Sequence, residues 1–526
     1  MNLQLKNFSK PFGILILLTV PVILFLSSLK TIKERDKVWY GGGYDPEYAY
    51  LMNSLNMTRF KLVGHFDHPG TTAQIAGGII LKASWLIDKR GEDLTTAVLS
   101  EPEHYLRILN ISSAAIGSLA IFLLSLFIFL TTGNFALALL FQATPFVSGF
   151  VLFNGFTRIT QEVMQMIAAF ALSAGAILWE KDEKRQVNTV HLWRFAIISG
   201  FGMASKVLFA PLMIIPVILL YGKKQKLRYI LYSFAAFVVF TIPILKLYPR
   251  MLYWFYRLFI HSGQYGQGEA NIINTNTYYR ELIHLFEVNP LLSGIFFCSM
   301  LILLFLIVRR ILYKNDLFDS KIRLLSATIL AQAIGYLLVA KQPKEAYLLP
   351  YESITAINLS IILYVVLSFF KGSLLKNFIT FTFVTASLLF IILSGLHKKS
   401  TIYSGEKNSL WEASYKASLD AKKNGAVIYI EPSSSPIVGL YFGNAYSKWQ
   451  YTEKLREIYP DVFIYVSYSG KIYQWGGKEI SLTSLLHHYN GQVVLFGRRL
   501  SIELVQTHFS IPEEGIKFTE IYQDDK

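Results

Sequence analysis

Four side chains that could do chemistry crowd into residues 39–72: Asp45, Glu47, Asp67 and His68. A carboxylate held against a hydroxyl group can take its proton while that oxygen attacks another atom. The pattern therefore predicts an acidic active-site loop. We expect Asp45 to be the principal catalytic carboxylate and Glu47 to support it.

The backbone around these acids has the pattern of a turn followed by a helix. Gly41 to Gly43 permit a sharp turn, and Pro46 suits a helix start. We expect Asp45 to be the N-cap of that helix and Glu47 to lie in its first turn. In the alternative interpretation, the pair is only a cap and an acid matched to the helix dipole.

The same acids could also form a metal site. Asp45 and Glu47 have a D-x-E spacing whose oxygen ligands suit Mg²⁺ or Mn²⁺, and Asp67 and His68 could add ligands. We expect no required metal, because basic residues can balance the charge of a phosphate. The single cysteine, Cys298, excludes an internal disulfide and a thiolate metal cluster.

Basic side chains border or interrupt apolar runs further along the chain. Arg158 lies between two runs together with the acid Glu162, and Lys206 breaks one long run. Lys341 and Lys344 directly follow another run. Ions near a bilayer are costly and usually have a task, and cations here could stabilise a departing phosphate. The alternative is that each aliphatic stem snorkels to the lipid headgroups, which suits Lys206 least.

Composition predicts a polytopic α-helical membrane protein. Hydrophobic residues make up 53% of the 526 residues, and the mean hydropathy is +0.40. Several apolar runs are long enough to cross a bilayer. The net charge of +15 resides almost entirely before residue 396, since residues 396–526 hold 15 Lys and Arg against 14 Asp and Glu. That distribution fits cytoplasmic loops and anionic lipid rather than nucleic acid.

We expect about eleven transmembrane helices. They lie near residues 11–29, 105–131, 135–153, 161–179, 195–205, 206–221, 229–247, 291–312, 324–340, 350–370 and 377–395. Lys6 and Lys10 precede the first run, which we interpret as a retained helix with a cytoplasmic N-terminus. Residues 72–88, which Lys82 interrupts, are expected to lie along the membrane surface, because a crossing there would upset the charge pattern downstream. A crossing is the rival topology.

The positive charges set the expected orientation. Alternation from a cytoplasmic N-terminus places four short basic loops in the cytoplasm, as the positive-inside rule requires. These loops are 180–194, 222–228, 309–323 and 371–376. The same alternation makes the acidic loop, residues 341–349 and the C-terminal residues extracytoplasmic. We expect the bacterial inner (cell) membrane, with the active site on its outer side.

Residues 396–526 change character and predict a small extracytoplasmic α/β domain. Three segments have strand patterns between Gly, Pro and Asn: 425–432, 461–468 and 491–498. Residues 447–459 and 482–489 suit helices between them. The expected organisation is thus a transmembrane catalytic domain over residues 1–395, followed by this domain.

Fixed cations combined with a few carboxylates suit an anionic leaving group. Polyprenyl phosphate fits, because its tail stays in lipid while its phosphate lies at the interface. The expected orientation puts the cations and the acidic loop on one side of the membrane. The predicted donor is therefore a polyprenyl-phosphate sugar.

Five segments, taken in order, resemble the GT-C superfamily of polytopic glycosyltransferases, in the layout of aminoarabinose transferases and protein O-mannosyltransferases. The segments are YDPEYAYLMNSL at 44–55, FDHPG at 66–70, EHYLRIL at 103–109, MASKVLFAPLMIIP at 203–216 and VAKQPKEAYLLP at 339–350. The resemblance implies a GT-C-like fold over about 320 residues. It also implies transfer of a sugar from a lipid phosphate.

The resemblance further implies roles for single residues. Asp45 matches the first-loop acid that orients or deprotonates the acceptor, and Lys206 and Lys341 match basic residues that hold the lipid phosphate. Pro46 separates acids that are usually adjacent, and Lys344 stands where many relatives carry His or Arg, so the sugar stays open. The substrate-binding candidates are Asp67, His68, Arg158, Lys206, Lys341, Lys344 and Tyr347.

We predict an inverting hexosyl- or pentosyltransferase that acts on the extracytoplasmic side. The expected partners are the polyprenyl-phosphate donor, membrane lipid and an envelope glycan, lipid or protein acceptor, but no nucleic acid. Two alternatives belong to other classes: a flippase or transporter of lipid-linked sugar, and a non-catalytic membrane scaffold.

Overall fold

The structure is a computed structural model. It describes residues 10–40, 43–88, 93–149, 155–313, 319–370, 372–400, 408–422, 425–433, 435–509 and 519–522. The chain divides into two compact units. Unit 1 is formed by Met1–Thr31, Phe66–Thr72 and Ser112–Ile402, and unit 2 by Ile32–His65, Ala73–Ile111 and Tyr403–Lys526. The boundaries of these units differ from the expected domains 1–395 and 396–526, because unit 2 also includes residues 32–65 and 73–111. The roles of the two expected domains stay predictions.

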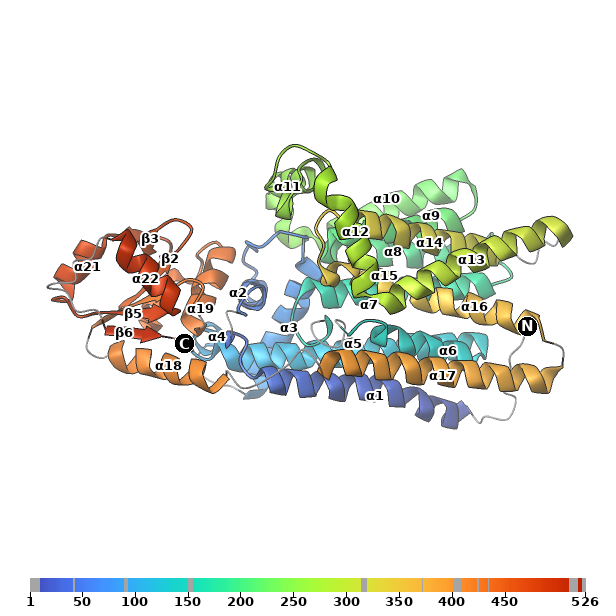
Figure 1. The fold of residues 1–526 in the computed structure, drawn as a ribbon, viewed down its shortest axis with the longest axis horizontal. Helices are drawn as coiled ribbons and strands as arrows, with labels where there is room; N and C mark the ends of the chain where they lie inside the picture. Colours follow the sequence, from blue (N-terminus) through green and yellow to red (C-terminus); the bar gives the residue numbers. More distant parts are fainter. Residues whose placement is uncertain are drawn as a thin grey trace. The chain divides into compact units, whose positions relative to one another are not determined.

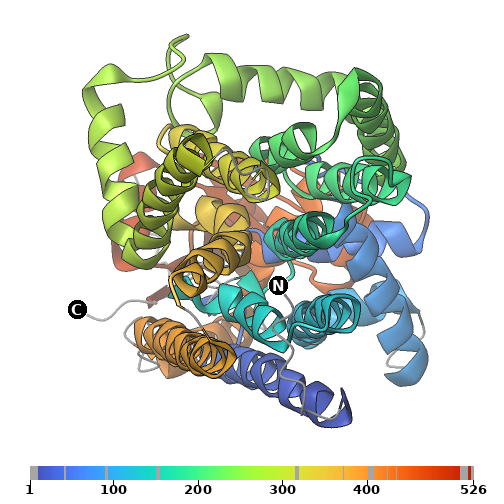
Figure 2. The ribbon, with the colours of Figure 1, turned by 90° about the vertical axis from the view of Figure 1, so that its right-hand side faces the viewer.

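Long apolar helices make up most of unit 1, and Figure 2 views most of them end-on. In the described part of the chain, six helices are long and apolar enough to cross a membrane. They are Lys10–Arg35 (α1), Pro102–Thr132 (α5), Gln161–Lys181 (α7), Pro290–Leu312 within α13, Asp319–Val339 (α14) and Leu375–Ser394 within α17. The structure therefore confirms the class of multi-pass helical membrane protein.

Two further helix pairs are long and apolar enough only when taken together, and each pair is sharply bent. Gly222–Phe240 (α10) continues into Ile242–Ile260 (η5 and α11) after a bend of 86°, and Glu345–Glu352 (η8 and α15) continues into Thr355–Ser368 (α16) after a bend of 49°. Counting each bent pair as one span gives eight among the described residues, so the expected number of eleven is not confirmed. Two expected spans, 135–153 and 206–221, correspond to the shorter apolar helices Phe135–Phe146 and Val207–Leu219, in which Pro145 and Pro211 interrupt α-helical hydrogen bonds. Residues 150–153 lie outside the described residues.

The full helices α13 and α17 span Pro290–Tyr313 and Ser373–Ser400. The remaining helical elements of unit 1 are shorter: α6 (Phe135–Ala143), η2 (Thr144–Phe146), α8 (Thr189–Ser205), η4 (Val207–Met213), α9 (Ile214–Leu219), η6 (Gln264–Gly266) and α12 (Thr275–Val288).

Buried amides join neighbouring helices. The Gln142 amide donates to the Leu17 carbonyl oxygen and to Ser125 Oγ, both at 2.7 Å. Such bonds satisfy polar groups that lipid could not.

Unit 2 carries a six-stranded mixed sheet in the order β4-β3-β2-β1-β5-β6. Figure 1 labels four of its strands, β2, β3, β5 and β6. The strands are β1 (Ala426–Ile430), β2 (Val462–Val466), β3 (Lys471–Tyr473), β4 (Glu479–Ile480), β5 (Val493–Gly497) and β6 (Thr519–Tyr522). The neighbours β2, β1, β5 and β6 run parallel, whereas β3 and β4 are antiparallel additions. All residues of β1, β2 and β5 are buried, which explains their continuous apolar sequence. The three expected strands are confirmed.

Helices cover both faces of this sheet. The unit contains the helices α2 (Glu47–Thr58), α3 (Thr71–Asp88), α4 (Leu94–Ser100), α18 (Asn408–Ala421), α19 (Pro436–Tyr446), α20 (Thr452–Ile458), α21 (Leu482–His488) and α22 (Arg499–His508). On one face, Ile428 and Leu495 pack with Ile502 of α22. On the other, the Tyr429 hydroxyl lies 3.1 Å from Ser418 Oγ of α18. The expected helices over 447–459 and 482–489 appear as α20 and α21.

Two glycines of α19 determine how it packs on α2. A Cβ atom on Gly443 would lie 2.6 Å from the Tyr48 carbonyl oxygen, and one on Gly439 would lie 2.8 Å from the Tyr48 ring. The backbones can approach this closely only because both positions lack a side chain. The helix that follows the acidic turn is thereby fixed to the C-terminal part of the chain.

Candidate functional site

The basic site in unit 1 is built at a break between two short helices. Helix α8 ends at Ser205, Lys206 is extended with φ −157° and ψ 135°, and η4 begins at Val207. Pro211 lies in η4, where it removes a backbone donor and disfavours a regular α-helix, and Pro216 lies in the first turn of the short helix α9 that follows. The predicted break at Lys206 is confirmed.

The FDHPG loop is bound to this break by main-chain hydrogen bonds. Pro69 and Lys206 form an isolated antiparallel bridge. The Val207 N–H donates to the His68 carbonyl oxygen at 2.8 Å, and the Gly70 N–H donates to the Ser205 carbonyl oxygen at 3.2 Å. Gly70 has φ +73°, a conformation that favours glycine. The two motifs, far apart in the sequence, therefore form one local structure.

The Lys206 side chain is buried and ion-paired. Only 1% of it is exposed, and its ammonium lies 2.5 Å from Glu162 Oε1. The ammonium also lies 4.4 Å from the centre of the Tyr347 ring. Because the side chain remains inside the unit, the snorkelling alternative for Lys206 was wrong.

Glu162 was not among the candidate site residues. It lies in the first turn of α7, after Thr160 at the N-cap position and the half-buried Arg158. Its sequence signal was an acid at the start of an apolar helix, where the helix dipole also favours a negative charge. Nothing in the local sequence indicated that it pairs with Lys206.

Two further predicted lysines lie in the same unit. The Lys344 ammonium lies 3.1 Å from the Tyr265 hydroxyl and 5.9 Å from the centre of the Tyr347 ring. The Lys341 ammonium donates to the carbonyl oxygens of Leu258 and Phe259, both at 2.7 Å. Lys341 thus binds carbonyls near the C-terminal end of α11, where a cation is favoured.

We call Lys206, Glu162, Tyr347, Lys344 and Tyr265 the lysine cluster. The structure brings together three predicted binding residues there: Lys206, Lys344 and Tyr347. Lys341 is not part of this cluster. Desolvation lowers the pKa of its ammonium group below the ordinary value.

His68 and Asp67 belong to the loop that is bound to the helix break. The His68 ring packs edge-on against Trp254, with 4.9 Å between ring centres. Trp254 was not singled out from the sequence. Asp67 is half-buried. The substrate-binding roles of both residues stay predictions.

Glu47, in unit 2, is completely buried and held by two donors. Arg35 Nη2 lies 3.0 Å from Glu47 Oε1, and the Asn110 amide donates to the same oxygen at 2.8 Å. A buried carboxylate is stable when it is paired and hydrogen-bonded in this way. The geometry gives Glu47 a structural role, and its catalytic role stays a prediction.

Asp45 is exposed, but it is not the N-cap of α2. The helix begins at Glu47 with Pro46 in the capping position and no side-chain cap. The Tyr44 carbonyl oxygen instead accepts the Tyr48 N–H at 3.0 Å, so a backbone turn does what the Asp45 side chain was expected to do. The capping prediction was wrong, and the catalytic role stays a prediction. Gly41 and Gly42 lie outside the described residues.

A second carboxyl group faces this turn and was missed. Glu431 follows β1 and hydrogen-bonds to Tyr44, whose pKa is raised by burial and by the charges of Glu431 and Asp45. Burial also raises the pKa of Glu431. Its position at the carboxyl end of a parallel strand is a frequent place for functional groups.

The residues proposed for a divalent ion do not fit one well. Asp45 is exposed, whereas Glu47 is buried and already bound to the Arg35 guanidinium. A cation at Glu47 would meet that positive charge. Among the described residues, no group of three or more Asp, Glu, His or Cys could hold a metal.

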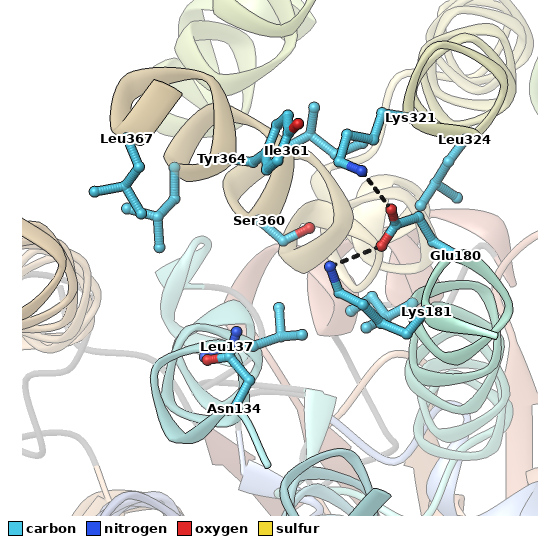
Figure 3. A pocket seen from close by; sticks show the side chains of 12 residues that line it. Asn134, Leu137, Glu180, Lys181, Lys321, Leu324, Ser360, Ile361, Tyr364 and Leu367 are labelled. Carbon is cyan, nitrogen blue, oxygen red and sulfur yellow. Dashed lines mark hydrogen bonds and ion pairs between the residues drawn. The ribbon is translucent and has the colours of Figure 1, made fainter. Parts of the chain in front are cut away.

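A second ionic cluster lies at the other end of α7 (Figure 3). Glu180 binds Lys321 at 2.7 Å and Lys181 at 2.9 Å, beside a cavity whose lining is half aliphatic. Arg185 lies over Trp179 and Arg323 over Tyr221. Aromatic rings and cations gathered at a helix end are typical of the headgroup level of a bilayer.

Comparisons with known proteins give remote matches. No family model and no curated protein matches the chain. The archaeal oligosaccharyltransferase AglB from Archaeoglobus fulgidus, in complex with an inhibitory peptide and a dolichol-phosphate, aligns with a TM-score of 0.42 and 13% identity, over 84% of this chain and 63% of that chain. An Archaeoglobus fulgidus oligosaccharyltransferase complex with Zn and sulfate aligns with a TM-score of 0.42 and 14% identity, over 84% of this chain and 62% of that chain.

This chain thus spans less than two thirds of the length of those oligosaccharyltransferases. Similarities at this level assign neither a family nor a substrate to it.

Proposed function

We propose that this protein is a membrane glycosyltransferase of the GT-C kind that takes a sugar from a polyprenyl-phosphate donor. The observation that carries the proposal is the buried Lys206, which lies at a helix break and is paired with Glu162. Replacing Lys206 by an aliphatic residue would be the simpler solution if only packing mattered. A retained cation there suits a substrate with an anion on a lipid tail.

The lysine cluster would hold the donor phosphate. An ammonium has three donors, and only one of those on Lys206 is required by Glu162. Lys344 supplies a second and more exposed cation beside the same tyrosine. Both cations would stabilise the negative charge that the phosphate gains as it leaves.

The proposed reaction is a single displacement. The oxygen of the acceptor hydroxyl attacks the anomeric carbon of the sugar while the bond from that carbon to the phosphate oxygen breaks. The bonding electrons leave with the polyprenyl phosphate, and the hydroxyl proton passes to a carboxylate. Attack opposite the leaving group inverts the configuration at the anomeric carbon.

Asp45 is the carboxylate that we propose for this proton. Its exposure leaves it accessible, in contrast to the buried Glu47. Asp67 is the second choice, because its loop is bound to the break at Lys206. Transfer is proposed to take place on the extracytoplasmic side of a bacterial inner membrane, with an envelope glycan, lipid or protein as acceptor.

Turnover of a radiolabelled polyprenyl-phosphate sugar tests this function. Purified protein should release free polyprenyl phosphate in the presence of an envelope extract, and Lys206→Ala should reduce the rate. A flippase would move the labelled lipid across vesicles without cleaving it, and a scaffold would do neither. Either result would contradict the proposal.

A further inference from the structure

Unit 2 contains a polar cleft that the proposed reaction does not use. Its volume is about 810 Å³, within the range of about 300–1,000 Å³ that is usual for ligand pockets. It lies between the end of α2, the C-terminal half of α3, the start of α4 and the start of α20. Every lining residue belongs to unit 2.

The acids of the cleft are already occupied. Asp93 is the N-cap of α4 and accepts the N–H groups of Thr95 and Thr96. Glu453 lies 3.0 Å from Arg456, and Glu457 lies 2.9 Å from Lys454. Two of the three acids are therefore paired with a neighbouring cation, and Asp93 is held by backbone N–H groups.

Three cations of the cleft have no ion pair in the described part of the chain. Arg59 donates only to the neutral Thr95 hydroxyl, at 3.4 Å. Lys61 lies 5.9 Å from the centre of the Tyr451 ring, and Lys82 lies 4.6 Å from that of Trp85. Desolvation and the nearby Arg59 lower the pKa of Lys61, as expected of a cation that lacks an anion. The cleft thus has a surplus of positive charge.

Aromatic and hydrogen-bonding groups complete the lining. Trp449 is half-buried and has φ +59°, a conformation that a tryptophan rarely adopts. Thr58, Thr95 and Gln450 add hydroxyl and amide groups. A flat ring beside several polar groups suits a sugar, which offers an apolar face of C–H bonds and a rim of hydroxyls.

We propose that this cleft binds an anionic saccharide, with its carboxylate or phosphate groups at Arg59, Lys61 and Lys82 and a sugar ring against Trp449. A free phosphate would use the cations and leave the ring and most of the volume unused. A neutral sugar would leave the three cations without partners. Binding here does not require that the protein transfers a sugar.

Calorimetry on the purified full-length protein can test this proposal with soluble probes. Tetragalacturonate should bind, whereas maltotetraose of the same length should not. Binding should weaken when the salt concentration rises from about 50 to 500 mM, because the charges lie near solvent. Arg59→Gln, Lys61→Gln and Lys82→Gln should each weaken it about two- to fivefold, as for exposed charge pairs.

The controls separate this site from the proposed reaction and from general charge effects. Lys416→Gln removes an exposed cation of the same unit outside the cleft and should leave binding unchanged. Lys206→Gln should bind the probe normally even if transfer is lost. Trp449→Ala should weaken tetragalacturonate but not inorganic phosphate.

Three outcomes would overturn the proposal. They are no binding of tetragalacturonate, equal binding of maltotetraose, and inorganic phosphate binding as tightly as the acidic sugar.

Discussion

Lys206 is held inside unit 1 by a carboxylate and an aromatic ring, so its charge is retained away from water. Breaking such a pair from one side leaves the other charge uncompensated, which typically costs about 3–5 kcal/mol. Any test of Lys206 therefore has to separate stability from binding.

We expect Lys206→Ala to lower donor use by at least about 10-fold, because a charge-assisted hydrogen bond to phosphate contributes about 1.5–3 kcal/mol. It should also lower the melting temperature, since Glu162 is left buried without its cation. Lys206→Arg should be only partly tolerated, because a planar fork does not fill the space of a compact ammonium. Steady-state kinetics and a thermal melt measure both effects.

The double variant Lys206→Met with Glu162→Gln is the matched control. It removes both charges of the pair, so the melting temperature should return close to the wild-type value. Donor use should stay low. If the double variant regains normal turnover, Lys206 has only a structural role.

Asp45 can be tested without disturbing the fold, because its side chain is exposed and does not cap α2. Loss of a positioned general base typically costs about 10²–10⁴-fold in rate. We therefore expect Asp45→Asn to insert and melt normally but to lose at least about 100-fold in turnover.

Asp36→Asn serves as the control for Asp45. Asp36 is a surface carboxylate of the same unit, 45% exposed and 2.7 Å from Arg107. Its replacement should leave turnover within about twofold, since a surface ion pair contributes about 0–1 kcal/mol. Near-normal turnover of Asp45→Asn would transfer the proposed role to Asp67.

At the scale of elements, the packing of α19 on α2 joins the segment after the acidic turn to the C-terminal sheet. Arg35, Glu47 and Asn110 add a buried polar contact to the same unit. The sheet itself presents Glu431 to Tyr44 beside the turn. Unit 2 thus fixes the backbone that carries Asp45 from several directions.

Gly443→Ala should disturb this packing. Its Cβ atom would lie 2.6 Å from a backbone oxygen, so the helices must separate, and overpacking of this kind typically costs about 1–3 kcal/mol. We expect a lower melting temperature. Gly294→Ala, in α13, is the control, because no atom of the described residues lies within 4 Å of its added Cβ and alanine favours a helix. Equal melting temperatures for the two variants would contradict the packing account.

At the scale of the molecule, the two ends of α7 carry different chemistry. Glu162 pairs with Lys206 at one end, and Glu180 pairs with Lys321 at the other. The helix has 21 residues, so its ends lie about 30 Å apart, close to the hydrocarbon thickness of a bilayer. The basic and aromatic residues near Glu180 favour the cytoplasmic interface for that end.

A reporter that is active only outside the cytoplasm tests this orientation. Fused after Lys526, it should be active, and fused after Lys224 it should be silent, because Lys224 lies in a basic loop. Expression of both fusions is compared by immunoblot. A silent C-terminal fusion on a stably expressed protein would reverse the proposed side of the C-terminal residues.

The sequence by itself determined the features that depend on residues close together in the chain, namely the helix type, the buried strands and one helix break. Apolar runs and basic loops predicted a multi-pass helical protein, buried strands showed as continuous apolar segments, and the break at Lys206 was visible as a charge inside an apolar run. The span expected over 206–221 is the short apolar helix Val207–Leu219 in the structure, because hydropathy does not register the proline-dependent shortening of a helix.

Only the tertiary structure decided which charges meet. Glu162 lies 44 positions before Lys206, and Asn110 lies 63 positions after Glu47, so no local period relates them. Glu431 and the cation-rich cleft depend on segments that come together only when unit 2 folds. Burial then determined which of these charges are paired, because a charge removed from water is stable only beside an opposite charge or a hydrogen-bonding partner.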